Sequence, residues 1–242
     1  MKLVTKDLIA ARMLLNGGRT VCFVGGGGKT TLMYALAMHR AKMGQRVLVS
    51  TTTHIYMPPR FYAAEESSVH ALWVQGQIAI IGTPEKEKLT APEPSLLANL
   101  RNQTDVLFLE ADGAKGHPCK VPAAHEPVID PECDLVVAVF GMSAIGRPLR
   151  EVCFRAEQAM ALLGVDAGHI LTPADAAKIL ISPLGGKKGI GACNWCAVLN
   201  QCDDGVRRKY AEAVTQQLES MGETNVVMTT FSKEERAAWS RI

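Results

Sequence analysis

Short, unbroken runs of apolar residues recur along the chain, and longer amphipathic stretches separate several of them. Runs of strand length cover residues 21–24, 46–50, 106–109, 135–140, 196–199 and 225–228. Runs that do not alternate with polar residues are typical of strands covered on both faces. Helical periodicity appears at 30–43, 94–101, 156–163 and 205–221. This alternation predicts an α/β fold with a mostly parallel central sheet and right-handed crossovers.

Three stretches depart from this alternation. Residues 1–12 mix charges into an apolar pattern, which predicts an amphipathic helix and not a signal peptide. Residues 56–95 contain many prolines and predict an irregular segment, in which 72–81 forms an extra strand pair around Gly76. Residues 113–133 hold four prolines and predict a long loop, a feature that is more often functional than idle. The length of 242 residues suits one α/β domain spanning 1–242.

Composition and charge indicate which partners and which cellular location to expect. The net charge is +2 with no long run of one sign, so we do not expect nucleic acid as a partner. No apolar run reaches 18 residues, so we expect no membrane span. Seven scattered cysteines and the lack of a signal peptide predict free thiols in a cytoplasmic protein. Cys193 and Cys196 form the one close pair, which we interpret as entering a buried strand; a redox or metal pair is the alternative.

A glycine-rich stretch follows the first apolar run and opens the first helical pattern. It consists of Gly25, Gly26, Gly27, Gly28, Lys29, Thr30 and Thr31. Backbone N–H groups in such a loop and at the following helix terminus converge on an anion, and glycine lets phosphate oxygens come close. Lys29 can reach the β- and γ-phosphates, and the Thr30 hydroxyl can ligate Mg²⁺. We therefore predict a P-loop NTPase-like three-layer sandwich that binds GTP or ATP.

The glycine stretch departs from the usual Walker A spacing. That pattern places a glycine six residues before the lysine, where this chain has Phe23. The remaining Gly-x-x-Gly-Lys-Thr is a shorter loop that resembles the loop of the Mur-type amide ligases.

Polar residues follow the next two predicted strands. Ser50-Thr-Thr-Thr-His54 offers three hydroxyls and an imidazole to a γ-phosphate or a metal, although a polar turn is the alternative. Glu110 and Asp112 end an apolar strand, as in a Walker B strand. One carboxylate can hold Mg²⁺ together with Thr30, while the other positions the attacking water. We predict Lys29, Glu110 and Asp112 as catalytic residues, and Thr30, Glu110 and Asp112 as metal ligands.

The fifth predicted strand ends in Asn200-Gln-Cys-Asp203, which resembles the guanine-reading Asn-Lys-x-Asp loop of GTPases. A carboxylate can accept both N1–H and N2–H₂ of guanine, and adenine lacks this donor pair. Gln201 stands where GTPases carry lysine, so GTP is favoured over ATP only by a small margin. The alternative is that Asn200 caps the following helix. We predict that Asn200 and Asp203 contribute to nucleotide binding.

Together these stretches resemble the bacterial family of selenium-dependent molybdenum hydroxylase accessory proteins. The specific blocks are Glu-Ala-Asp-Gly-Ala-Lys-Gly and Ala-His-Glu-Pro-Val-Ile, which lie within residues 109–129. The resemblance covers roughly residues 20 to 205. It implies a P-loop-like, nucleotide-binding protein that assists maturation of a molybdenum hydroxylase, with that enzyme or its cofactor as partner.

The segment 114–129 and a nearby group of arginines carry further candidate chemistry. Lys115, His117, Lys120, His125 and Glu126 are placed to reach the phosphate site, where they could bind an anionic second substrate, a metal or a partner. A solvated polar loop is the alternative. The arginines Arg147, Arg150 and Arg155 follow the fourth strand; each is a candidate arginine finger, and a surface salt bridge is the simpler role.

The function that the sequence favours is a Mg²⁺-dependent NTPase that acts in metalloenzyme maturation. Two alternatives stay open. One is a kinase or Mur-like ligase that uses the nucleotide on a small acid or cofactor, and the other is a binding module that responds to nucleotide without hydrolysing it.

Overall fold

The computed structural model describes residues 19–232 and 234–235, so the helix predicted for residues 1–12 lies outside the described residues. A seven-stranded sheet occupies the centre, in the order β12-β11-β9-β1-β7-β2-β4. All of its pairings are parallel. Its strands are β1 (Thr20–Gly25), β2 (Val47–Thr51), β4 (Ala79–Ile80), β7 (Val106–Glu110), β9 (Leu135–Gly141), β11 (Asn194–Asn200) and β12 (Val226–Met228).

The sheet has its first strand, β1, in the middle. The chain builds β2, β4 and β7 on one side of β1 and then β9, β11 and β12 on the other. The order therefore reverses beside β1, and in open parallel sheets a ligand binds at the carboxyl ends of the strands at such a switch point. The register fixes which residues meet at this edge: Thr51 lies opposite Glu110, and Asn200 lies opposite Gly141.

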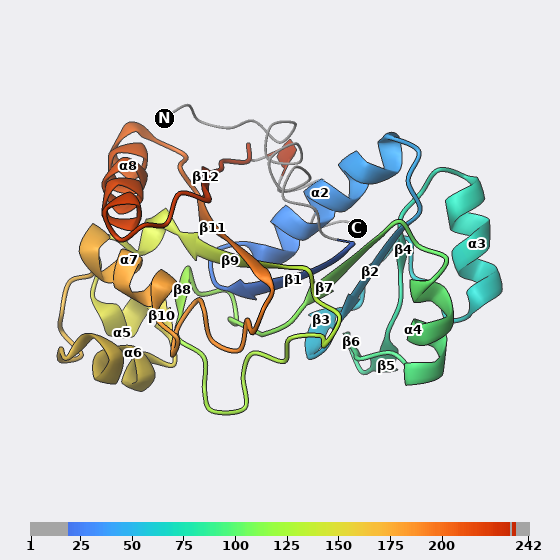
Figure 1. Cartoon of the computed structure of the whole chain (residues 1–242), viewed down its shortest axis with the longest axis horizontal. Helices are drawn as coiled ribbons and strands as arrows, with labels where there is room; N and C mark the ends of the chain where they lie inside the picture. The colour runs from blue at the N-terminus through green and yellow to red at the C-terminus, as the bar shows by residue number, and fades with distance from the viewer. Residues whose placement is uncertain (1–18, 233, 236–242) are drawn as a thin grey trace.

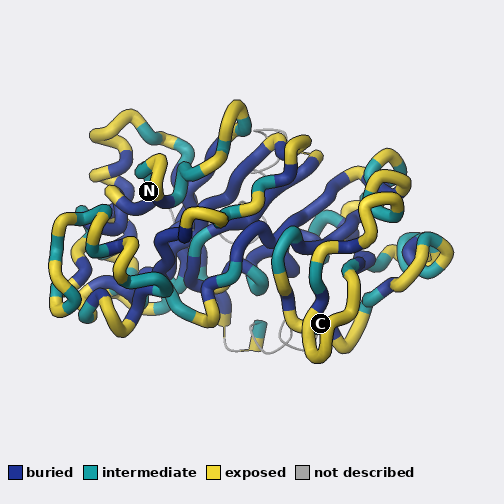
Figure 2. Tube along the Cα trace, turned by 90° about the horizontal axis from the view of Figure 1, so that it is seen from below, coloured by how far each residue is buried: buried dark blue, intermediate teal, exposed yellow. Residues whose placement is uncertain are grey.

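Helices cover both faces of the sheet, as Figure 1 shows. They are α2 (Lys29–Lys42), α3 (Glu66–Val74), α4 (Pro94–Arg101), α5 (Leu149–Val152), α6 (Ala156–Leu163), α7 (Pro173–Ile181) and α8 (Gly205–Ser220), with a 3₁₀ turn η1 (Met142–Ala144). Successive residues of β1 point to opposite faces and enter different cores. Phe23 packs in the same core as Leu32 of α2, whereas Cys22 and Val24 belong to the core shared with α3–α8. The result is three layers, helix, sheet and helix, with the strands as the dark blue centre of Figure 2.

Two small sheets lie at the carboxyl edge of the main sheet. Three antiparallel strands form one of them: β3 (His54–Tyr56), β5 (Thr83–Glu85) and β6 (Lys88–Thr90). Two parallel strands form the other: β8 (Cys119–Lys120) and β10 (Cys153–Phe154). The β8–β10 pair anchors the long loop that follows β7, and Cys119 and Cys153 remain free thiols.

The six strands predicted from apolar runs and the mostly parallel sheet are confirmed, as are the helices predicted at 30–43, 94–101, 156–163 and 205–221, to within a residue or two at their ends. The strand pair predicted around Gly76 is wrong. Residues up to Val74 belong to α3, Gly76 turns the chain with a φ of 67°, and β4 then joins β2. Segment 56–95, predicted to be irregular, instead contains α3, β4, β5 and β6. No helix within the described ranges has the length and apolar character needed to cross a membrane.

Candidate functional site

The glycine loop between β1 and α2 is shaped by tight packing. A Cβ atom on Gly25 would lie 2.3 Å from the Val139 carbonyl oxygen, and one on Gly27 would lie 2.3 Å from the Gly141 nitrogen. Both glycines have φ near +90°, a conformation that side chains disfavour. The glycines therefore admit the neighbouring strand β9, and the N–H groups of Gly25, Gly26 and Gly27 are bonded within the protein. Gly28 is the N-cap of α2, so the helix terminus faces the same spot.

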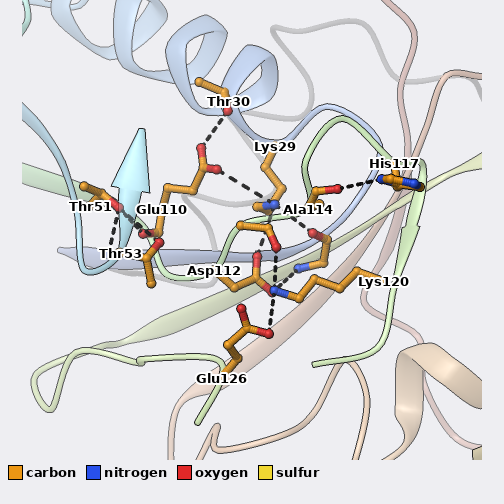
Figure 3. A network of polar contacts seen from close by, with 12 residues as sticks. Lys29, Thr30, Thr51, Thr53, Glu110, Asp112, Ala114, His117, Lys120 and Glu126 are labelled. Atoms are coloured by element: carbon orange, nitrogen blue, oxygen red, sulfur yellow. Dashed lines mark hydrogen bonds and ion pairs between the residues drawn. The ribbon is translucent and has the colours of Figure 1, made fainter. Parts of the chain in front are cut away.

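Lys29 lies almost fully buried between the ends of β1 and β7, at 4% exposure (Figure 3). Its Nζ donates to the Gly25 carbonyl at 2.7 Å and lies 3.1 Å from Asp112 Oδ1 and 3.9 Å from Glu110 Oε1. Burial alone would lower the pKa of Lys29. The charges of Asp112 and Glu110 outweigh burial and raise it, so the lysine stays charged.

Glu110 and Thr30 lie next to each other where the glycine loop meets the cleft. The Thr30 hydroxyl donates to Glu110 Oε2 at 2.6 Å, which joins the first turn of α2 to the end of β7. Burial raises the pKa of Glu110, and the nearby Lys29 charge and the Thr30 hydrogen bond offset that rise only in part. A hydroxyl and a carboxylate that converge in this way offer the oxygen ligands that Mg²⁺ prefers.

Asp112 contacts the glycine loop from beneath instead of facing the cleft. Its Oδ2 accepts from the Gly25 N–H at 3.0 Å and lies 3.4 Å from the Lys120 ammonium. Lys120 is completely buried, donates to the Gly113 carbonyl at 2.6 Å and pairs with Glu126 at 3.1 Å. This chain of contacts fixes the long loop after β7 to the base of the glycine loop (Figure 3).

Glu126 connects this series of contacts to Arg155. The guanidinium donates from Nε at 2.8 Å and from Nη2 at 3.2 Å to the two carboxylate oxygens. Burial alone would raise the pKa of Glu126, but hydrogen bonds from Arg155, the Ala123 N–H and Lys120 lower it from 4.5 to about 2. Arg155 therefore forms a salt bridge, which is the simpler of the two roles predicted for these arginines. Arg147 pairs with Glu151 on the surface, away from the loop.

The end of β11 reaches the glycine loop through the side chain of Asn200. Asn200 Nδ2 donates to the Gly27 carbonyl at 2.7 Å, and Asn200 Oδ1 accepts from the Thr229 hydroxyl at 2.7 Å. Asp203 accepts from the Thr230 hydroxyl at 2.8 Å and from Arg207 at 3.1 Å. The N-cap of α8 is Asp204, so Asn200 is not the helix cap that we held as the alternative.

A cleft of about 1210 Å³ opens above the glycine loop and extends across the carboxyl edge of the sheet. One wall contains Gly27, Gly28, Lys29, Thr30, Thr31 and Glu110; another contains Thr52, Thr53, His54, Tyr56, Lys88 and Thr90; a third contains Lys115, His117, His125, Glu126, Phe154 and Arg155. The cleft thus gathers the ends of β1, β2 and β7 with the loop after β7, as their positions in the sequence predict.

Some predicted residues lie outside this cleft or are committed elsewhere. Asn200 and Asp203 do not line it. Ser50 donates to the Ile81 carbonyl at 2.9 Å, and Thr51 to the Glu110 carbonyl at 2.8 Å, so these two hydroxyls tie the end of β2 to the residue after β4 and to the end of β7. Phe154, Tyr56 and Lys88 also line the cleft, and none of them was predicted from the sequence. Nothing in their local pattern distinguishes them, because their place in the cleft comes from the small sheets.

The sheet order, with a glycine loop between its central strand and α2, defines an α/β protein of the P-loop NTPase-like class. More closely, the chain belongs to the YqeC family: the family model described as "YqeC protein" matches residues 21–157. The chain is 30% identical over 188 residues to the YqeC protein of Escherichia coli (strain K12), and the alignment covers 70% of each chain. The match at 21–157 includes the glycine loop, Glu110 and Arg155, and it ends before Asn200.

Two solved structures of HypB align with this chain over most of its length. One is HypB from Helicobacter pylori in complex with nickel, with a TM-score of 0.38, 10% identity and coverage of 97% of this chain and 91% of that one. The other is the hydrogenase maturation factor HypB from Archaeoglobus fulgidus, with a TM-score of 0.37, 11% identity and coverage of 97% and 93%. At these scores the alignments identify nothing beyond what the sheet topology already defines.

Proposed function

We propose that this protein is a Mg²⁺-dependent NTPase that assists maturation of a selenium-dependent molybdenum hydroxylase. The observation that carries the proposal is the convergence of three groups at the glycine loop. These are the buried Lys29 ammonium, the Thr30 hydroxyl and the Glu110 carboxylate. Phosphoryl transfer to water needs positioning and charge neutralisation above all, and this set supplies both.

The residues take distinct roles in the proposal. The N–H groups of Gly28 and of the first turn of α2 bind the phosphates, because those of Gly25, Gly26 and Gly27 are already bonded within the protein. Lys29 turns from Asp112 toward the phosphates. Thr30 and Glu110 would hold Mg²⁺, which would supply neutralisation of the phosphate charge. Asp112 is a positioning residue, because it already holds the Gly25 N–H and the Lys29 ammonium and is only 1% exposed.

GTP is the nucleotide that we propose, by a small margin over ATP. Asn200, the last residue of β11, attaches the strand end to Gly27, so a base lying along the segment that follows is next to bound phosphates. Reading guanine requires Asp203 to exchange its bonds with Thr230 and Arg207 for the base. That exchange weakens GTP binding, and the preference for guanine is correspondingly small.

The biological setting rests on the blocks within residues 109–129 that resemble the accessory family of selenium-dependent molybdenum hydroxylases. These blocks contain Glu110 and Glu126, which line the cleft, and Asp112, which lies beneath the glycine loop. The residues that carry the resemblance are thus the ones that shape the cleft. We propose the hydroxylase or its cofactor as the partner and the cytoplasm as the location.

The proposal is tested by measuring phosphate release from GTP and ATP at varied Mg²⁺ concentration. The variant is Thr30→Val, which keeps the shape of the side chain but removes the hydroxyl next to Glu110. Its matched control is Thr83→Val, an exposed threonine on β5 outside the cleft. We expect Thr30→Val to need at least ten-fold more Mg²⁺ and Thr83→Val to behave as the wild type. No nucleotide binding by the wild type, or equal Mg²⁺ dependence in both variants, contradicts the proposal.

A further inference from the structure

The wall of the cleft opposite β3 is built around one aromatic ring. Phe154 lies beneath the Lys115 ammonium at 5.3 Å, the Lys120 ammonium at 5.6 Å and the Arg155 guanidinium at 5.0 Å from its centroid. The His117 ring packs against it with centroids 5.8 Å apart. Lys120 is buried and paired with Asp112 and Glu126, so Lys115 and Arg155 are the cations that this wall presents to the cleft. The ring face helps to hold their charge in place.

This wall lies directly against the glycine loop. The Gly27 N–H donates to the His117 carbonyl at 3.0 Å, and β8 pairs with β10 so that Lys120 is opposite Phe154. Lys115 and Arg155 both have left-handed backbones, with φ of 47° and 65°. Such conformations are costly for residues other than glycine and gather at ligand-binding sites. A ligand held here lies next to whatever the glycine loop binds.

The charges on this wall are not balanced within it. Glu126 is the carboxylate that the wall contributes, and it is committed to Lys120 and Arg155. Arg155 uses Nε and Nη2 for that pair, so the donors of Nη1 lie outside it. Lys115 is exposed and forms no ion pair with any residue in the ranges that the structure describes. The charged residues of this wall that line the cleft are Lys115, Arg155 and Glu126, and their summed charge is +1.

The cleft also has room for two ligands. Its volume of about 1210 Å³ exceeds the roughly 300–1,000 Å³ of a pocket for one small molecule. The glycine loop has its own cation, Lys29, buried on the other side of Asp112. Lys115 and Arg155 are therefore cations additional to Lys29, the cation of the glycine loop.

We infer that Lys115, His117 and Arg155 form a binding site for a second, small anion that carries a carboxylate or a phosphate. The site deepens the proposed function, on which it rests for the identity of its neighbour: the anion lies beside the nucleotide phosphates and does not replace them. Lys115 and the remaining Arg155 donors bind its oxygens, and His117 closes the site toward the glycine loop.

The test is a calorimetric titration of the full chain with inorganic phosphate and, separately, with malonate. Each titration is run without nucleotide and with Mg²⁺ and a β,γ-imido analogue of GTP already bound. The variant is Lys115→Ala, because removing Arg155 would also free Glu126. The matched control is Lys88→Ala, an exposed lysine on the opposite wall whose ammonium lies 5.4 Å from the Tyr56 ring.

We expect one anion per chain to bind in the presence of the nucleotide analogue. Lys115→Ala should weaken that binding about ten-fold or more, as expected for the loss of a charge-assisted contact, and Lys88→Ala should leave it within two-fold. Binding of phosphate but not malonate, or the reverse, identifies which anion the site takes. Loss of anion binding when the nucleotide analogue is added overturns the inference, because the anion then occupied the glycine loop. Equal affinities in Lys115→Ala and wild type also overturn it.

Failure of the proposed function gives a different result. It shows as the absence of binding when the wild type is titrated with the β,γ-imido analogue of GTP and Mg²⁺ before any anion is added. The nucleotide-free titrations of Lys115→Ala and Lys88→Ala then decide whether the anion site exists by itself.

Discussion

Replacing Glu126 with glutamine should destabilise the protein in a way that depends on pH. The change keeps the shape of the side chain but removes the charge that pairs with Arg155 and Lys120. Lowering the pKa from 4.5 to about 2 corresponds to about 3 kcal/mol, at about 1.4 kcal/mol per pH unit. Arg155 is 29% exposed and partly screened by water, so we expect a loss of about 2 kcal/mol at pH 7. For a chain of this size that is a fall in Tm of about 4–8 °C.

The sign of the pH dependence follows from the lowered pKa. The stabilisation from the Glu126 carboxylate is complete above its unfolded pKa and is lost as the pH falls toward about 2. The difference between wild type and Glu126→Gln should therefore shrink from pH 5 downward and nearly vanish at about pH 2.

Urea unfolding followed by circular dichroism at pH 7, 5, 3.5 and 2.5 measures this difference. The control is Glu132→Gln, which removes an exposed carboxylate from its pair with Arg101 and should cost less than about 1 kcal/mol. The reasoning is refuted by a difference at pH 7 below about 0.5 kcal/mol. It is equally refuted by a difference that is as large at pH 2.5 as at pH 7.

Three further predictions concern the nucleotide site. Because burial raises the pKa of Glu110, Mg²⁺ affinity in the presence of nucleotide should decrease as the pH is lowered, over a range above the usual pKa of 4.5. A Glu110→Gln variant should bind Mg²⁺ weakly at every pH. The same pH profile in the variant and the wild type would contradict this prediction. Asp203→Asn should lose GTP affinity and gain XTP affinity by competition titration, and an unchanged ratio would exclude guanine reading by this residue. Asn200→Ala removes the partners of Gly27 and Thr229, so urea unfolding should show a loss of about 1–3 kcal/mol; a loss below about 0.5 kcal/mol would remove Asn200 as a brace.

The strands of the main sheet were predictable because each is an unbroken apolar run. Residues 135–140 and 196–199 are buried on both faces, and such burial leaves a signal that needs no knowledge of neighbours. Helix α3 was missed because the apolar residues Leu72–Val74 and Ile78–Ile81 read as one stretch, although the first lie in a helix and the second lead into β4. Helix α7 carries a capping box, with Thr172 and Asp175 bonded to each other, a local signal that the apolar pattern alone does not use.

The site was predictable where the fold class dictates position and unpredictable where side chains meet across loops. Glu110 was predicted from its place at a strand end and Thr30 from its place at a helix start. The structure places the Thr30 hydroxyl 2.6 Å from Glu110 Oε2. The roles of Glu110 and Asp112 differ only because Asp112 turns beneath the loop toward Lys120. Lys120 comes from a proline-rich loop whose path depends on β10, a two-residue strand with no signal of its own.

During synthesis on the ribosome, β1 is the first strand of the described sheet to emerge, yet both of its neighbours come much later. Cys22 pairs with Leu109 on one side and with Val136 on the other, and β2 pairs with β7 and β4, not with β1. The nascent chain therefore exposes two apolar strands without their shared partner until β7 has left the exit tunnel. This interval is when we expect mispairing with other chains and capture by a chaperone. The glycine loop is made early, but Asn200, the partner of its Gly27 carbonyl, is made late, so the proposed nucleotide site is complete only when translation is nearly finished.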